Sequence, residues 1–377
     1  IWHAFAPAES STHPAPNASW KGPARKWSDQ QAWHARYKAQ MDLPDSSPVI
    51  ELIESFRRSK AMFAATSLGV FDLLERKPAD LTTLAAELCL ETDPLERLLG
   101  ACVGLKLLRR NGAAYENERV ASTYLCRASQ HALTGYILYS NAVLFPLWSH
   151  LEDAIREGTP RWKQAFGLEG GIFDHFFRTD EAKQSFLQGM HGLGLLSSAK
   201  VVEAFDLSRF GRLVDLGGAT GHLAIAACER YPELRAVVFD LPQVIEAARA
   251  EASRSAAGRR IDVMAGDFFR DELPPADLFA LGRVLHDWAE DKIHRLLTKI
   301  CGRLSAGGGI LISEKLLHED GTGPLSAQLQ SLNMLVCTEG KERTLSEYRW
   351  LLEAAGFRNV QGQITGTPLD AVLAIKP

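Results

Sequence analysis

The chain has 377 residues with a formal net charge of −4, and 46% of its residues are hydrophobic. This length exceeds one ordinary domain and allows two hydrophobic cores. The acidic balance disfavours binding to nucleic acid, and no apolar run reaches membrane-spanning length, so we expect neither nucleic acid nor a membrane as a partner.

The first part of the chain is rich in Pro, Ala and Ser and shows no sustained hydrophobic period. We therefore expect residues 1–47 to form a disordered linker, with a short helix over residues 30–41 as an alternative. Four tryptophans in this segment could instead dock on a partner domain. They are Trp2, Trp20, Trp27 and Trp33.

Residues 48–206 predict a helical domain followed by connecting helices. Apolar spacing over residues 81–86 and 94–99 indicates a helix-turn-helix, and Tyr115 and Val120 indicate a short wing. A winged helix can bind DNA, but the second helix of this one carries little positive charge. We therefore disfavour DNA binding.

The same region has two sets of large apolar side chains. One set lies on a single helical face and consists of Phe56, Met62, Phe63 and Leu68. The other set is aromatic, and its members could roof a ligand pocket or form ordinary core. It consists of Trp148, Trp162, Phe166, Phe173, Phe176 and Phe177.

Residues 207–377 alternate strands and helices in a Rossmann-like pattern. A strand over residues 212–216 runs into a glycine turn and then a helix. Asp215 lies at the end of this strand, where a carboxylate suits the ammonium group of an amino-acid cofactor better than a pyrophosphate. S-adenosylmethionine (SAM) carries such a group, and Gly217 and Gly221 would allow its close approach.

Two further acids follow the next two strands. Asp240 lies where Rossmann-type folds bond ribose hydroxyls. Asp267 lies beside Gly266 and Phe268, a combination that suits an adenine amino group and ring face. Each acid alone could be a helix cap or a turn residue, but three acids at successive strand ends predict one SAM site. An NAD-dependent dehydrogenase fits Asp215 and the glycine spacing poorly.

A histidine and two acids follow later strands. His286 lies where a strand beginning near Asp277 gives way to a helix, which suits a general base. Glu314 ends the strand over residues 310–313, and Glu342 lies in a polar loop. Histidine with two acids on separate loops is typical of a base with its orienting partners, although a lone histidine at a helix start is as often structural. No metal site is predicted, because the histidines lack ligand spacing.

The end of the chain predicts an antiparallel hairpin of residues 357–363 and 371–375. The six cysteines of the whole chain show no Cys-x-x-Cys spacing. We therefore expect reduced thiols and a cytoplasmic location.

These segments together resemble the class I SAM-dependent O-methyltransferases, and among them the acetylserotonin (hydroxyindole) O-methyltransferase family. The resemblance is carried by residues 68–74, 215–221, 266–269, 283–288, 307–311, 331–335 and 342–344. It implies an α/β fold: a Rossmann-like SAM-dependent methyltransferase domain with a mostly parallel seven-stranded sheet over residues 207–377. It also implies a preceding all-helical, winged-helix-like domain that forms a homodimer.

The resemblance also implies a role for individual residues. The general base falls on His286, its orienting acids on Glu314 and Glu342, and contacts with a small aromatic acceptor on Asn333 and Phe177. Cofactor roles fall on Gly217, Asp240, Asp267, Phe268 and Arg283. The expected reaction is methyl transfer from SAM to the hydroxyl of a hydroxyindole or phenol-like acceptor, with concerted proton removal by histidine.

Three positions depart from the family pattern. Ala219 replaces a usual third glycine, and Phe177 and Gly194 fall where close relatives carry a Tyr and a Trp that line the pocket. We expect weaker cofactor binding from Ala219. The departures favour an alternative, a catalytically impaired SAM-binding or dimerisation module. The chain resembles a branch in which this region follows a Maf-type nucleotide pyrophosphatase domain, so an upstream domain is expected, in line with a first residue that is Ile1.

Overall fold

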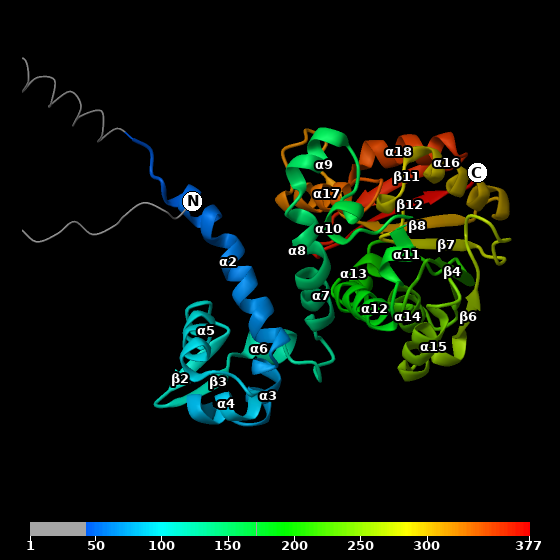
Figure 1. Ribbon diagram of the computed structural model, residues 1–377. Coiled ribbons are helices and arrows are strands. Elements are labelled where there is room, and N and C mark those ends of the chain that lie inside the picture. The colour runs from blue at the N-terminus through cyan, green and yellow to red at the C-terminus, as the bar shows by residue number, and fades with distance from the viewer. Residues whose placement is uncertain (1–42, 171) are drawn as a thin grey trace, which may run out of the picture. The chain divides into compact units, whose positions relative to one another are not determined.

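A computed structural model of the chain describes residues 43–170 and 172–377 (Figure 1). The chain divides into two units, residues 1–56 and residues 57–377, and each is described by itself. The predicted linker falls almost entirely outside the described residues, as do the helix predicted over residues 30–41 and the four tryptophans before it and within it.

The N-terminal part of the second unit is a small winged helix. Helix α2 (Ser47–Ser67) leads into it from the first unit. Its remaining elements are α3 (Val70–Arg76), β1 (Ala79–Asp80), α4 (Leu81–Leu88), α5 (Thr92–Gly104), β2 (Leu108–Asn111), β3 (Ala114–Asn117) and α6 (Arg119–Tyr124). The strands form an antiparallel sheet in the order β1-β3-β2, so the domain is helical with a small sheet rather than all-helical.

The predicted helix-turn-helix is present as α4 and α5. Helix α4 begins at a side-chain cap, because the Asp80 carboxylate accepts a hydrogen bond from the Thr83 amide at 2.8 Å. Tyr115 lies in β3, as the predicted wing requires, whereas Val120 lies in α6 and not in the wing. The wing therefore ends earlier than predicted.

Eight short helical segments connect this domain to the large sheet. They are α7 (Thr134–Tyr139), the π-helix η1 (Ser140–Leu144), α8 (Phe145–Trp148), α9 (Leu151–Glu157), α10 (Trp162–Phe166), α11 (Ile172–Phe176), α12 (Asp180–Leu195) and α13 (Ser198–Glu203). An aromatic cluster packs among them, with Phe176 stacked on Phe186 at a ring distance of 4.3 Å. The indole N–H of Trp162 donates to the Cys337 carbonyl at 2.7 Å, which ties these helices to the C-terminal domain.

The C-terminal domain contains a seven-stranded sheet in the order β11-β12-β8-β7-β4-β5-β6. Its strands are β4 (Arg212–Leu216), β5 (Arg235–Asp240), β6 (Ile261–Ala265), β7 (Leu278–Gly282), β8 (Gly309–Glu314), β11 (Arg358–Gln363) and β12 (Asp370–Ile375). Strands β4 to β8 are parallel, and β12 pairs antiparallel with both β8 and β11. The predicted mostly parallel sheet and the closing hairpin are confirmed.

Helices cover both faces of this sheet (Figure 1). They are α13, α14 (His222–Arg230), α15 (Ile245–Arg254), α16 (Glu290–Arg303) and α18 (Leu345–Ala354), whereas α17 (Leu325–Cys337) packs with α8 and α9. One apolar cluster packs α16 and α18 against the sheet, and a second packs α13, α14 and α15. The carboxyl ends of the parallel strands meet at one edge, which is where α/β folds place their ligand sites.

Two smaller expectations concern cysteines and membranes. All six cysteines are free, as the absence of paired spacing predicted. Among the described residues, no helix combines the length and the apolar content that crossing a bilayer requires. The predicted domain boundaries after residues 47 and 206 stay predictions.

Candidate active site

A single cavity at the carboxyl edge of the sheet collects most of the predicted site residues. Those that line it are Phe177, Asp215, Gly217, Asp240, Gly266, Asp267, Phe268, Arg283, His286 and Asn333, together with Ala219. Gly221, Glu314 and Glu342 do not line it and lie behind its wall. The three acids at or after the ends of β4, β5 and β6 therefore face one cavity, together with residues that follow β7.

The glycine turn after β4 places bare backbone against the cavity. Gly217 and Gly221 have φ angles of +64° and +78°, in the left-handed region that favours glycine. A Cβ on Gly217 would lie 3.1 Å from Val284 Cγ2, and one on Gly221 would lie 2.9 Å from Val238 Cγ2. The turn therefore has no room for side chains at these two positions.

Asp215 and Arg283 present two unsatisfied polar groups at the site. Asp215 is 1% exposed, and its Oδ2 accepts from the Ala224 amide at 3.2 Å, while its Oδ1 has no hydrogen-bond partner among the described residues. Burial raises the pKa of Asp215 to about 7. The buried Nε of Arg283 also lacks a partner within the described part of the chain. A buried carboxylate oxygen and a buried guanidinium N–H without partners among the described residues fit the ammonium and carboxylate groups of an amino-acid cofactor.

Asp240 and Asp267 hold the backbone of the turns around them. Asp240 accepts from the Ala219 amide at 2.8 Å and from the Leu241 amide at 2.7 Å, and burial raises its pKa to about 6. Asp267 accepts from the Phe269 amide at 2.8 Å. Each acid therefore shapes its loop as well as facing the cavity, and the predicted ribose and adenine contacts stay predictions.

Ala219 adopts the glycine-like conformation that its place in the turn requires, with a φ angle of +51°. This left-handed conformation costs an alanine about 1 kcal/mol or more. We expect Ala219→Gly to raise the free energy of unfolding by about 1 kcal/mol and to lower the Kd for SAM, because the strain and the methyl group at the cavity are both removed. Thermal unfolding with calorimetric titration measures both quantities.

A matched control is Ala226→Gly, inside α14 and away from the cavity. It is expected to destabilise the chain by about 1 kcal/mol, because glycine is a poor helix former. A destabilisation of similar size at position 219 would show that the turn is not strained there.

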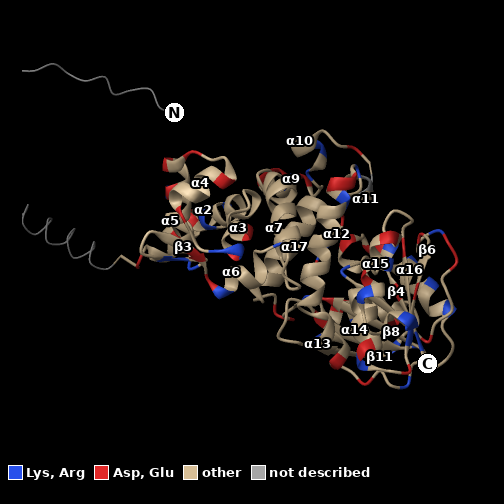
Figure 2. Ribbon diagram, turned by 90° about the horizontal axis from the view of Figure 1, so that it is seen from below, with Lys and Arg blue, Asp and Glu red and all other residues tan. Residues whose placement is uncertain are grey.

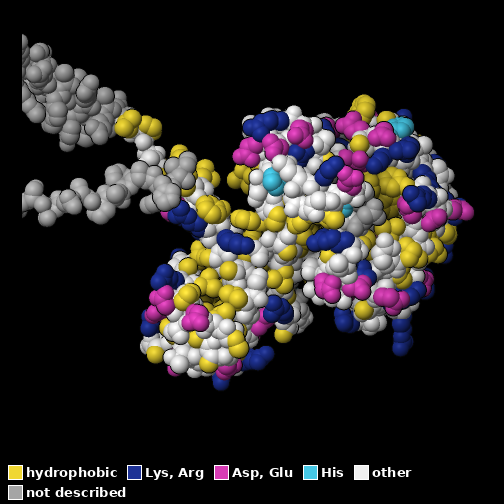
Figure 3. Space-filling view, in the orientation of Figure 1, with side chains coloured by type: hydrophobic (Ala, Val, Ile, Leu, Met, Phe, Trp, Pro, Cys, Tyr) yellow, Lys and Arg dark blue, Asp and Glu magenta, His cyan; other side chains and the backbone are white. Residues whose placement is uncertain are grey.

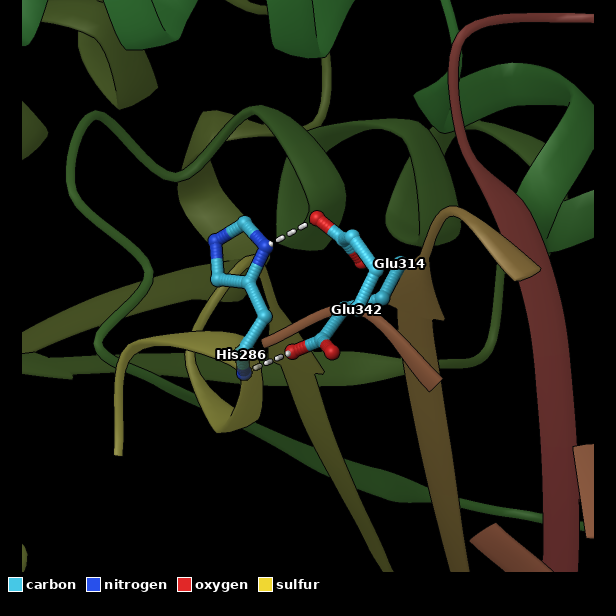
Figure 4. Close-up of side chains that lie close together, drawn as sticks. All are labelled: His286, Glu314 and Glu342. Carbon is cyan, nitrogen blue, oxygen red and sulfur yellow. Dashed lines mark hydrogen bonds and ion pairs between the residues drawn. The ribbon is translucent and has the colours of Figure 1, made fainter. Parts of the chain in front are cut away.

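His286 lies in a short 3-10 turn after β7 and is almost completely buried. Its Nδ1 lies 2.7 Å from the Glu342 Oε1 (Figure 4). Strand β10 (Arg343–Thr344), which follows Glu342, pairs with β9 (Leu316–Leu317), which follows β8, and this pairing brings the Glu342 loop to the edge of the sheet. This bond fixes the orientation of the imidazole and leaves Nε2 as the ring nitrogen that can accept a proton.

Glu314 does not orient the imidazole of His286, contrary to the prediction. Its Oε1 accepts from the backbone amides of Val284, Leu285 and His286 at 3.1, 2.7 and 3.2 Å, and its Oε2 accepts from the hydroxyl of Tyr348. The physical reason is that Glu314 ends β8, beside the first residues after β7. It therefore holds the turn that carries His286.

The charges around His286 decide its pKa. Burial alone lowers the pKa, but Glu342, Asp287 and Glu314 are negative and together raise it to about 9. Burial raises the pKa of the neighbouring Asp287 to about 6, against the lowering effect of His286 and Arg283. The neutral imidazole is therefore a strong base, and the neighbouring carboxylates stabilise the imidazolium that forms when it accepts a proton.

One group of donor atoms among the described residues is compact enough to hold a metal ion. It consists of His286, Glu314 and Glu342, whose donor atoms lie within 4.8 Å of one another. Hydrogen bonds already engage both oxygens of Glu314 and the Nδ1 of His286. The Oε2 of Glu342 has no hydrogen-bond partner among the described residues, and the expectation of no metal site stays a prediction.

Aromatic side chains form one wall of the cavity. Of the predicted aromatic set, Phe173, Phe176 and Phe177 line the cavity, whereas Trp148, Trp162 and Phe166 do not line it and pack in the aromatic cluster of the connecting helices.

The Trp148 indole N–H donates to the Asn333 Oδ1 at 2.9 Å. This bond identifies the oxygen of the Asn333 amide and leaves the amide nitrogen for the cavity. Asn333 thus offers a donor to a ligand, as an acceptor-binding residue would.

Gly194, which falls where the family pattern has a Trp, does not line the cavity. It is buried, and a Cβ there would lie 2.3 Å from the Nε2 of His222. The imidazole of His222 fills the space beside it and lines the cavity instead. The sequence carried no signal for this, because a histidine at a helix start has several structural explanations.

An O-methyltransferase dimerisation domain model matches residues 50–127, and an O-methyltransferase domain model matches residues 148–358, more than half of the chain. The chain belongs to the O-methyltransferase family. This O-methyltransferase is 44% identical over 333 residues to the acetylserotonin O-methyltransferase of Bos taurus, a match that covers 86% of the chain and 96% of that protein.

Two further relatives bear on this O-methyltransferase. The chain is 41% identical to the probable bifunctional dTTP/UTP pyrophosphatase/methyltransferase protein of Homo sapiens, over 88% of the chain and 54% of that protein. The crystal structure of human N-acetylserotonin methyltransferase in complex with SAM matches with a TM-score of 0.84 and 40% identity, over 89% of the chain and 99% of the other. A SAM-dependent methyltransferase fold and SAM as the cofactor are thereby confirmed.

Proposed function

We propose that this O-methyltransferase transfers a methyl group from SAM to the hydroxyl of a small aromatic acceptor of the hydroxyindole type. The observation that carries the proposal is the buried pair of His286 and Glu342, joined at 2.7 Å, beside a cavity with an aromatic wall. The names of the relatives, which are acetylserotonin O-methyltransferases, support the acceptor class.

The residues of the chain divide the work of such a reaction. Asp215 and Arg283 have unpartnered buried atoms that fit the amino-acid end of SAM, and the bound cofactor supplies an activated methyl group. The aromatic wall and Asn333 orient the acceptor and exclude water. His286 Nε2 removes the hydroxyl proton, and Glu342 stabilises the imidazolium that forms.

The catalytically impaired alternative is not favoured. Its support came from Ala219, Phe177 and Gly194, yet Ala219 keeps the glycine-like backbone of the turn and Phe177 still contributes an aromatic ring to the cavity. The match to the bovine relative, whose name is acetylserotonin O-methyltransferase, also covers 96% of that protein.

The test is an assay of methylated product with SAM and a panel of hydroxyindoles and phenols that includes N-acetylserotonin, with Asp240→Ala as the control. Asp240→Ala removes the acceptor of two backbone amides, that of Ala219 in the cofactor turn and that of Leu241 directly after β5. We expect it to raise the Kd for SAM at least about tenfold, because hydrogen bonds to a charged group contribute about 1.5 to 3 kcal/mol.

Calorimetric titration with SAM measures that loss. A wild-type chain that binds SAM but methylates no member of the panel would support the impaired alternative. Equal SAM affinity of the wild type and Asp240→Ala would contradict the assignment of the cofactor turn.

The partners and the location are proposed on separate grounds. A homodimer through the dimerisation domain is supported by exposed apolar residues along α2 (Figure 3). They include Val49, Ile50, Leu52, Ile53 and Phe56. Of the predicted dimer face, Met62 and Phe63 pack partly on the winged-helix core instead, and Leu68 is exposed.

Acidic and basic residues are interspersed around α4, α5 and β3 (Figure 2), which gives no support to DNA binding.

An upstream nucleotide pyrophosphatase domain in the full-length protein is supported by the length of the bifunctional human relative. A cytoplasmic location is supported by six free cysteines.

A further inference from the structure

His222 is a polar residue that lines the cavity. The proposed mechanism assigns it no role, and it was not among the predicted cofactor-binding residues. It begins α14 directly after Gly221 and lines the cavity. Its Nδ1 lies 2.8 Å from the Ser198 Oγ, and that hydroxyl lies 2.8 Å from the Gly194 carbonyl oxygen.

These two bonds fix the tautomer of His222. A carbonyl oxygen can only accept, so the single hydroxyl proton of Ser198 is donated to Gly194. The Ser198 Oγ must then accept from an Nδ1–H of His222. Burial, helped by the positive charges of His191 and Arg283, lowers the pKa of His222 to about 3, so the ring is neutral and its Nε2 is an acceptor.

The packing of the ring leaves the Nε2 edge open. A Cβ on Gly194 would lie 2.3 Å from Nε2 and 2.4 Å from both Cδ2 and Cε1. Because these three distances are nearly equal, Gly194 covers the face of the ring and not its Nε2 edge. Within the described residues, Nε2 has no hydrogen-bond partner, so it presents an unused acceptor to the cavity.

Asp215 provides a second unused acceptor near the same helix turn. Its Oδ2 accepts from the amide of Ala224, in the first turn of α14 where His222 lies, and its Oδ1 has no partner in the described part of the chain. An ammonium group has three N–H donors, more than one carboxylate oxygen satisfies. We propose that the Nε2 of His222 accepts a hydrogen bond from the α-ammonium group of SAM, beside Asp215. This rests on SAM as the cofactor.

The experiment is calorimetric titration of the full chain and of His222→Ala with three ligands. SAM carries both the ammonium and the carboxylate group, decarboxylated SAM keeps the amine alone, and 5′-methylthioadenosine lacks the whole amino-acid end. We expect His222→Ala to weaken SAM and decarboxylated SAM roughly 10- to 100-fold and to leave 5′-methylthioadenosine unchanged.

Two further variants test whether the loss of affinity in His222→Ala comes from the missing acceptor. His222→Gln keeps an acceptor oxygen near the place of Nε2 and is expected to restore most of the SAM affinity. His294→Ala is the matched control, because His294 is an exposed residue of α16 that does not line the cavity, so SAM affinity is expected to stay the same.

Several outcomes would overturn the proposal. A loss for SAM but not for decarboxylated SAM would assign His222 to the carboxylate, and an equal loss for 5′-methylthioadenosine would assign it to the nucleoside. Unchanged binding of all three ligands with a raised acceptor KM would assign it to the acceptor. If the wild type bound none of the ligands, the cofactor assignment itself would fail.

Discussion

His286→Ala is expected to lower kcat about 10²- to 10⁴-fold, the usual contribution of a positioned general base. The variant removes the group that takes the hydroxyl proton and leaves Asp215, Asp240 and Arg283 in place, so the Kd for SAM is expected to stay the same. Single-turnover kinetics with a hydroxyindole acceptor and calorimetry with SAM measure the two quantities. Retention of most of the wild-type kcat would show that His286 is not the base.

The pH dependence separates this role from a structural one. The base acts as neutral imidazole, and the pKa of His286 is about 9, so kcat/KM is expected to rise with pH and level off above about 9. Glu342 raises that pKa, so Glu342→Gln is expected to shift the rising limb to lower pH and to reduce kcat. A limb that stays in place in Glu342→Gln would assign it to another group.

The same raised pKa has a stability consequence of definite sign. The folded chain binds the proton of His286 more tightly than the unfolded chain, whose histidine titrates near about 6.5. The resulting stabilisation is complete below about pH 6.5 and is lost as the pH rises through about 9. Activity and this part of the stability therefore change in opposite directions with pH.

Glu314→Ala is expected to lower the free energy of unfolding by about 3 to 5 kcal/mol, because several buried donors lose their acceptor and each unsatisfied donor costs about 1 to 3 kcal/mol. The change leaves the backbone amides of Val284, Leu285 and His286 and the hydroxyl of Tyr348 without their acceptor. Because the turn that carries His286 loses its anchor, kcat is expected to fall as well. Denaturant unfolding measures the stability.

Matched variants separate the two halves of this network. Tyr348→Phe removes one donor and leaves the three backbone bonds, so a smaller loss of about 1 to 3 kcal/mol is expected. Glu314→Gln keeps an acceptor oxygen for the turn and is expected to retain more activity than Glu314→Ala. A loss of stability below about 1 kcal/mol in Glu314→Ala would contradict the anchoring role.

Much of the C-terminal domain could be predicted from the residues themselves. The strand over 212–216 has the predicted bounds, because an apolar run closed by a glycine turn has few other conformations. Asp215, Asp240 and Asp267 could be assigned to one site because the carboxyl ends of parallel strands meet at one edge. That argument needs only the order of strands and turns along the chain.

Only the tertiary structure decided which side-chain atoms of the site contact one another. Glu314 and Glu342 are equivalent in the sequence pattern, yet one binds the backbone of the His286 turn and the other binds its imidazole. The pairing of Gly194 with the ring of His222 likewise joins α12 to α14. Such contacts depend on side-chain direction and on packing between distant segments, which spacing along a chain does not specify.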